Sequence, residues 1–324
     1  MKKILLATTM LAGTAGFAAA EVAVSGYAEI GIWSNAAGDV AFWQDVEVKF
    51  TGSGTTDGGL EFGAVIDLDE TDVDVNDDNG TSVWVSGAFG KLTMGDTDGA
   101  IDWALADMDG GMTSIADDHS THNAWFGGNA FDGQGDNQVV RYENTFGDVA
   151  FALSAEQENN GVSGSETILG VAVKYTANMG GTDVALGLGY QDAGDLGSAI
   201  GVSASAALAG GFGGKIAYID YKDTGVFAPA VPPAAATGPE FINGGSLAGS
   251  IESHLGLEVS YKSGPIGVAV NYGEADFGAA GNVDSWGAVA NYDLGGGAVA
   301  MFGYGSDVGG TSDDQWSLGL GLSF

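Results

Sequence analysis

The last thirteen residues, SDDQWSLGLGLSF at 312–324, are the feature that most constrains what this chain can fold into. Large apolar side chains occupy every second position, with only Ser or Gly between them: Trp316, Leu318, Leu320, Leu322 and Phe324. Alternate side chains of a β-strand point to opposite faces, so one face of this segment is large and apolar and the other is small and polar. A strand of this kind requires a different solvent on each face.

The same alternation recurs along the chain. Large apolar residues (Val, Ile, Leu and aromatics) occupy one set of alternate positions, and small or polar residues occupy the other set. This pattern is found in residues 45–51, 184–190, 255–262 and 266–273. The apolar row often ends in an aromatic residue, which is where an amphipathic ring meets a membrane interface. These segments are therefore interpreted as two-faced strands, whose large face meets lipid and whose small face meets water.

The connections between these segments alternate in length. Short, glycine-containing connections are typical of tight turns, and they stand at 88–91, 146–148, 263–265 and 294–297. Longer connections are acidic or contain proline, and they stand at 67–80, 97–136 and 223–249. A count from turn to turn gives sixteen strands, the first near Val22 and the last ending at Phe324. Short turns on one rim and long loops on the other are typical of a membrane β-barrel.

Residues 1–20 differ from the rest of the chain. Lys2 and Lys3 precede an uncharged apolar run that ends in small alanines, as in a cleaved export signal. An N-terminal membrane anchor is the alternative, but the apolar run is shorter than the ~20 residues of a spanning helix. We expect residues 1–20 to be removed and residues 21–324 to form one transmembrane domain.

A closed barrel follows from the physics of the bilayer. The 57 glycines disfavour helices, and Gly, Asp or Asn interrupts every later apolar run. Lipid offers no hydrogen-bond partner, so the first strand has to pair with the last and leave no open edge. The predicted fold is therefore all-β, a sixteen-stranded antiparallel transmembrane barrel whose lumen is too wide for side chains to fill.

Charge and composition exclude several classes of function. The formal net charge is −34, or −36 once Lys2 and Lys3 leave with the export signal, which repels nucleic acids and attracts cations. Three His and no Cys leave few candidates for nucleophilic catalysis, so we expect no enzyme. A barrel-shaped lipase using Ser253 and His254 is one alternative. A soluble, acidic exported β protein is another, although its outer face would not be the apolar one.

Several motifs resemble those of the trimeric general-diffusion porins, especially the alphaproteobacterial type: SGAFGKLTMGD at 86–96, GTTDGGLEFGA at 54–64, RYEN at 141–144 and the terminal Phe324. The resemblance implies a homotrimer in the outer membrane of a Gram-negative bacterium, with short periplasmic turns, long external loops and one water-filled pore per subunit. It also implies contacts with lipid and lipopolysaccharide, and recognition of Phe324 by the outer-membrane assembly machinery. The implied function is passive diffusion of ions and small hydrophilic solutes; a solute-specific channel is the alternative.

The resemblance also implies a pore constriction made by the third long loop, which folds into the barrel in this family. Residues 97–136 occupy its place and would supply the acidic side of the constriction: Asp98, Asp102, Asp107, Asp109, Asp117 and Asp118. Arg141 matches the basic wall arginine of the family, but on the second strand Lys49 stands beside Asp45 and Glu47 where basic residues are usual. The field is then predominantly negative, and we expect a preference for cations.

Two acidic or histidine-containing stretches invite a metal interpretation. Asp72, Asp74 and Asp78 lie in a run that lacks the Gly and Glu of an EF-hand. Weak calcium binding there stays open, beside a contact with a neighbouring subunit that the resemblance implies for this loop. His119 and His122 have no spacing that fixes a transition-metal geometry. No other cofactor is expected.

Overall fold

The computed structural model describes residues 21–34, 39–69, 80–115, 122, 124, 130–132, 138–157, 167–224, 251–306 and 314–324. The expected export signal lies outside these residues. So do several residues singled out in the sequence: Asp72, Asp74, Asp78, Asp117, Asp118 and His119.

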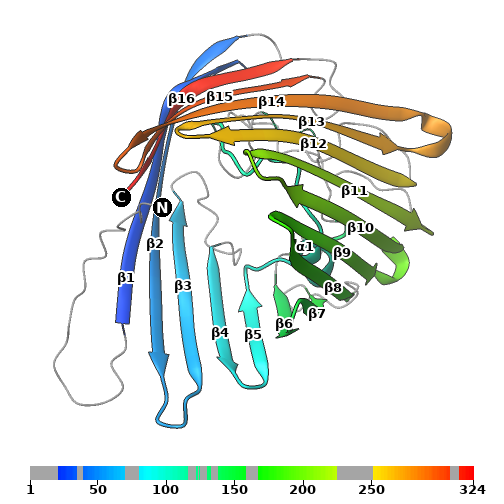
Figure 1. Ribbon diagram of the computed structural model, residues 1–324. Helices are drawn as coiled ribbons and strands as arrows, with labels where there is room; N and C mark the ends of the chain where they lie inside the picture. The colour runs from blue at the N-terminus through cyan, green and yellow to red at the C-terminus, as the bar shows by residue number, and fades with distance from the viewer. Residues whose placement is uncertain are drawn as a thin grey trace.

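Sixteen antiparallel strands form one closed barrel in which each strand pairs with its neighbours in the sequence (Figure 1). The seam pairs the first strand with the last, with Ile30 opposite Leu320. The strands are β1 (Glu21–Ser34), β2 (Val40–Thr55), β3 (Glu61–Asp69), β4 (Thr81–Gly87), β5 (Gly90–Gly95), β6 (Val139–Phe146), β7 (Val149–Glu156), β8 (Ile168–Met179), β9 (Thr182–Asp192), β10 (Ser198–Ala207), β11 (Phe212–Lys222), β12 (Ser253–Ser263), β13 (Ile266–Asp276), β14 (Asn282–Gly295), β15 (Ala298–Ser306) and β16 (Gln315–Ser323). The predicted number of strands and the predicted closure are confirmed.

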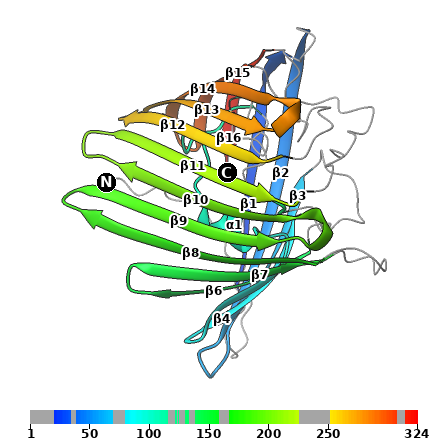
Figure 2. The same cartoon turned by 90° about the vertical axis from the view of Figure 1, so that its right-hand side faces the viewer.

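Tight turns join the strands at one rim, whereas the connections at the other rim range from five residues, as between β13 and β14, to the long stretches predicted from the sequence (Figure 2). All four predicted turns join consecutive strands, for example β6 to β7 and β12 to β13. Gly147 and Gly264 take φ values of 61° and 57° in these two turns, a region that side-chain-bearing residues rarely enter. The three long connections named above start from the ends of β3, β5 and β11, which lie at the opposite rim.

The side chains alternate between the two faces as predicted. On β16, Leu318 is 51% exposed on the outside, whereas Ser317 is fully buried on the inside. On β13, Val270 is 55% exposed and Asn271 is 1% exposed. The outer surface is therefore a continuous apolar band, which only lipid can cover favourably.

Aromatic rings accompany this band at both rims. Near the tight turns, Phe146 stacks on Phe151 with ring centroids 6.0 Å apart. Toward the other rim, the Trp286 and Tyr304 rings are 4.8 Å apart. Rings at these two heights suit the interfaces of a bilayer.

The described residues contain one short α-helix, α1 (Ala100–Ala104), and two 3-10 turns, η1 (Gly194–Leu196) and η2 (Gly278–Ala280). No helix among the described residues is long and apolar enough to cross a membrane. Helix α1 lies inside the ring of strands, next to β8 and β9 (Figure 1).

The inner wall is less uniformly exposed to water than the alternation of side chains alone predicts. Ile101 and Met108 of the long connection after β5 pack against inward-facing Ile168, Ile219 and Tyr221 of the wall, and all five are buried. This apolar cluster forms because the connection covers that part of the wall and excludes water from it. The lumen is thus open only where the connection leaves it uncovered.

Candidate pore constriction

The connection between β5 and β6, which we name the inward loop (residues 96–138), enters the barrel directly after β5, and its described residues 96–115, 122, 124 and 130–132 lie against the inner wall. At the start of α1, the backbone N–H of Ala100 donates to Ser154 Oγ of β7 at 2.8 Å. The Nζ of Lys174 on β8 lies 4.5 Å from the centre of the Trp103 ring. The first turn of the loop is therefore held by β7 and β8.

Beyond α1 the loop follows the next strands in order. The backbone N–H of Ala106 donates to Ser203 Oγ of β10 at 3.1 Å. Asn271 of β13 donates to the carbonyl of Met108 at 2.5 Å and accepts from the N–H of Ala124 at 3.2 Å. In each case a wall side chain bonds the backbone of the loop.

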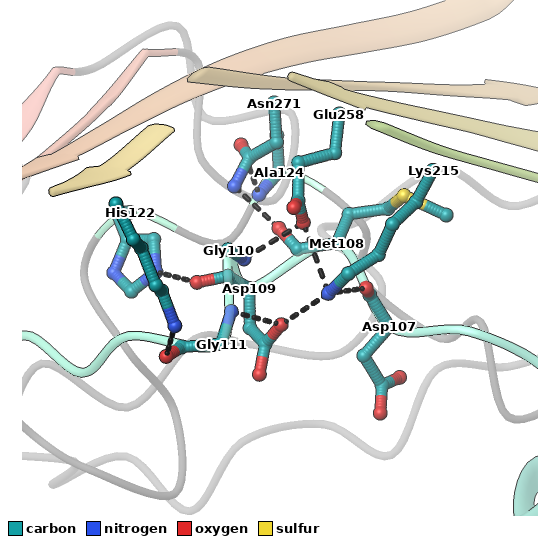
Figure 3. A network of polar contacts seen from close by, with 11 residues as sticks. Asp107, Met108, Asp109, Gly110, Gly111, His122, Ala124, Lys215, Glu258 and Asn271 are labelled. Carbon is teal, nitrogen blue, oxygen red and sulfur yellow. Dashed lines mark hydrogen bonds and ion pairs between the residues drawn. The ribbon is translucent and has the colours of Figure 1, made fainter. Parts of the chain in front are cut away.

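A polar network on β11 and β12 holds the middle of the loop (Figure 3). Lys215 Nζ donates to the carbonyl oxygen of Asp107 and to Asp109 Oδ1, both at 2.7 Å. The same nitrogen lies 3.2 Å from Glu258 Oε2, which accepts from the Gly110 N–H at 2.7 Å. Loop and wall share one continuous set of charged hydrogen bonds.

The loop then passes over glycines of the last strands. A Cβ added at Gly303 of β15 would lie 2.6 Å from Ser114, and one at Gly319 of β16 would lie 2.5 Å from Ile115. Ile115 also reaches Gly31 of β1. At Gly319 the small inner face of β16 therefore contacts the loop and not open water, whereas a Cβ at Gly321 would meet Tyr27 and Met301 of the wall.

The inward loop presents its aspartates to the lumen unequally. The Asp98 side chain is 60% exposed, and Asp107 is also exposed. Asp109 is held by Lys215, and Asp102 is half-buried beside α1. Of the four predicted constriction aspartates that the structure describes, Asp98 and Asp107 are the ones most open to water.

The loop carboxyl groups also differ in acidity. The Asp107 side chain is exposed at its surface, but the loop and wall around it displace part of its water, and this desolvation, with the nearby charge of Asp109, raises the pKa of Asp107. Burial would also raise the pKa of Asp109, but the hydrogen bond and charge of Lys215 hold it below its ordinary value. Burial raises the pKa of Asp102 well above its usual range and that of Asp132 to about 7. Asp109 is thus the most firmly ionised of these groups.

The predicted wall residues of β2 are brought together with one that was not singled out. Lys49 Nζ lies 3.0 Å from Glu47 and 2.5 Å from Asp67, which stands directly opposite it on β3. Glu47 and Lys49 are partly open to the lumen, whereas Asp45 is buried. This part of the wall therefore carries an excess of negative charge.

Arg141 does not stand across the lumen from the loop. Its Nε donates to Glu143 at 2.9 Å, and its Nη1 donates to the carbonyl oxygen of Asp98 at 2.5 Å. The Asp98 carboxylate is 3.5 Å away, and Arg141 is only 7% exposed. The arginine fastens the beginning of the loop to β6 and presents little charge to the lumen.

Sequence patterns did not identify the residues that hold the loop: Ser154, Ser203, Lys215, Glu258 and Asn271. The alternation of their strands does place each of them on the inner face. The alternation does not give the height along the barrel axis at which the loop lies, because that height depends on the shear of the whole sheet.

Comparison with known proteins agrees with this architecture. A family described as Gram-negative porin matches residues 7–320. A porin of Rhodobacter capsulatus is 31% identical over 314 residues, which cover 94% of this chain and 100% of that protein.

Solved structures show the same fold. A porin structure refined at 1.8 Å superposes with a TM-score of 0.71 at 27% identity, covering 94% of this chain and 100% of the other. A triple mutant of the Rhodopseudomonas blastica porin gives a TM-score of 0.67 at 17% identity, with the same coverage. The chain therefore belongs to the Gram-negative porin family: it is an outer-membrane channel for passive diffusion and not an enzyme.

Proposed function

We propose that this porin prefers cations to anions. The observation that carries the proposal is the engagement of every basic side chain of residues 21–324. The chain has nine Lys and Arg, of which two lie in the expected export signal. The remaining seven all contact an acidic group, a carbonyl oxygen or an aromatic ring: Lys49, Lys91, Arg141, Lys174, Lys215, Lys222 and Lys262.

The acidic side chains of the passage are not all compensated by basic groups in this way. The Asp107 carboxylate is exposed, the Asp98 carboxylate stays 60% exposed although Arg141 lies 3.5 Å away, and Lys49 is flanked by two carboxylates. Two unit charges 4 Å apart interact by about 4 kcal/mol at an effective dielectric of 20. Salt screens exposed groups over about 8 Å, but a residual difference of about 1.4 kcal/mol is tenfold in partition. The excess of exposed carboxylates along the passage therefore favours cations.

A reversal potential tests the proposal. The purified porin is inserted into a planar bilayer that separates two KCl concentrations, and the zero-current potential is recorded. We expect the sign that corresponds to K⁺ permeating faster than Cl⁻. A potential of the opposite sign would contradict cation preference and leave the channel function untouched.

We also propose a homotrimer that is assembled through recognition of the C-terminal residue. Phe324 exchanges backbone hydrogen bonds with Gly26 at 2.8 and 2.9 Å, and the residue is 67% exposed. An exposed ring next to the seam suits recognition by the assembly machinery before or during closure of the barrel.

Two measurements test these proposals. The yield of Phe324→Ala barrels in the outer membrane tests the recognition of Phe324, and gel migration of unheated and heated samples tests the trimer. Monomers without heating would contradict the trimer.

A further inference from the structure

The polar network of Figure 3 joins two parts of the chain that are about a hundred residues apart. The ammonium group of Lys215 has three donors, and three acceptors lie within reach: the Asp107 carbonyl, Asp109 Oδ1 and Glu258 Oε2. The side chain of Glu258 is fully buried. Lys215 is thus the one cation that balances a buried wall carboxylate and holds the loop at the same time.

The wall bonds mainly the backbone of the loop. Ser203, Glu258 and Asn271 meet N–H or carbonyl groups, and a second lysine, Lys262, donates to the carbonyl of Gly111 at 2.6 Å. Such bonds fix the path of the loop without using its acidic side chains. Asp109 is the closest exception, because its carboxylate bonds Lys215 at 2.7 Å, whereas the Asp98 carboxylate lies 3.5 Å from Arg141.

The wall is also shaped to receive the loop. A Cβ at Gly287 of β14 would lie 1.6 Å from the carbonyl oxygen of His122. No side chain larger than hydrogen fits there unless the loop moves away. Side chains of β10 to β13 therefore hydrogen-bond the inward loop, and the absence of a side chain at Gly287 of β14 lets the same loop lie directly on the wall.

We propose that Lys215 is a positioning residue that sets the width of the pore. Asp109 serves as the loop partner of Lys215, whereas the neighbouring Asp107 keeps its carboxylate free for permeating ions. Without the ammonium group, Glu258 would be left buried with an uncompensated charge, and this destabilises the seated loop. The loop would then leave the wall and change the cross-section open to solutes. This inference rests on the diffusion channel and not on its ion preference.

Neutral sugars of increasing size test the proposal, because their passage depends on width and not on charge. Liposomes containing Lys215→Met are compared with liposomes containing Lys222→Met. Lys222 lies on the same strand and forms an ion pair with Asp220 at 2.8 Å, away from the inward loop, so both variants lose one positive charge from β11. We expect Lys215→Met to shift the size limit and to increase open-channel current noise, and Lys222→Met to behave as the unchanged protein. Equal size limits and equal noise in the two variants would overturn the proposal, whatever the ion preference is.

Two further variants separate positioning from folding. Lys215→Arg retains the charge and the donors, and we expect it to restore the size limit. If Lys215→Met yields no barrel, Gly287→Ala tests whether the seated loop sets the pore width. Gly52→Ala is its control, because a Cβ at Gly52 would lie 4.0 Å from its nearest atom and displace nothing. Gly287→Ala should change the size limit and Gly52→Ala should not. An unchanged limit in Gly287→Ala would equally contradict a loop held in place by the wall.

Discussion

At the scale of single residues, Asp107 and Asp109 show how two identical side chains of one loop take different environments. Asp109 bonds Lys215 and the N–H of Gly111, so its charge is compensated inside the protein. Asp107 contributes its backbone carbonyl to Lys215 and leaves its carboxylate exposed. A carboxylate that faces the water path without a cation beside it has the larger effect on passing ions.

We therefore predict that Asp107→Asn lowers the cation preference. If this carboxylate contributes up to about 1.4 kcal/mol, the ratio of K⁺ to Cl⁻ permeability falls by at most about tenfold. Asp293→Asn is the matched control, since it removes the same charge at the tight turn between β14 and β15. The reversal potential in a KCl gradient measures both variants, and equal shifts would show that the position of the charge is unimportant.

The cation preference should also depend on pH. The pKa of Asp107 lies above its ordinary value of 3.8, so this exposed group takes up a proton before Asp109, whose pKa is lowered. As the pH falls from 7, the negative charge at Asp107 is lost and the preference for cations declines before pH 3.8 is reached. Reversal potentials between pH 7 and 4 measure this decline. A preference that is constant over this range, or a decline of the same size in Asp107→Asn, contradicts the assignment, because only the part of the decline due to Asp107 is lost in that variant.

At the scale of the strands, successive residues meet different environments. On β13, Val270 faces outward and Asn271 holds the inward loop. The strands and their faces could be predicted because a period of two is imposed by the strand itself. The contacts that inward-facing side chains make with the loop could not be predicted, because the local sequence does not show how far one strand is staggered against another.

A charge on the outer face should destabilise the barrel according to its depth. Val270 lies near the middle of β13, so Val270→Arg is expected to cost about 2–4 kcal/mol of unfolding free energy. Ile266 begins the same strand next to a tight turn, and Ile266→Arg should cost only about 0–1 kcal/mol. Urea unfolding in lipid vesicles measures both. If the two arginines cost the same, the apolar band does not lie in the bilayer as its exposure indicates.

At the scale of the whole molecule, the acidic excess and the pairing of the basic side chains act together. The formal net charge of the chain is −34, and the closed wall concentrates part of that charge around one narrow passage. Low-dielectric surroundings strengthen the field there, and salt weakens it.

The preference for cations should therefore decrease with ionic strength. The screening length falls from about 10 Å at 0.1 M salt to about 3 Å at 1 M, so exposed carboxylates act over shorter distances. Reversal potentials recorded at a fixed concentration ratio, but at low and high mean KCl, give the permeability ratio in each case. A ratio that does not change would mean that exposed charges do not select the ions.

The sequence by itself determined the two-faced strands, their number, the tight turns and the closure of the wall. These follow from a side-chain period of two and from the absence of hydrogen-bond partners in lipid. Only the tertiary structure decided which aspartates stay open, that Arg141 lies beneath the loop, and that Lys215 and Gly287 hold the loop against the wall. Those contacts join residues far apart in the chain, and they exist only once strand stagger has set the height of each inward side chain.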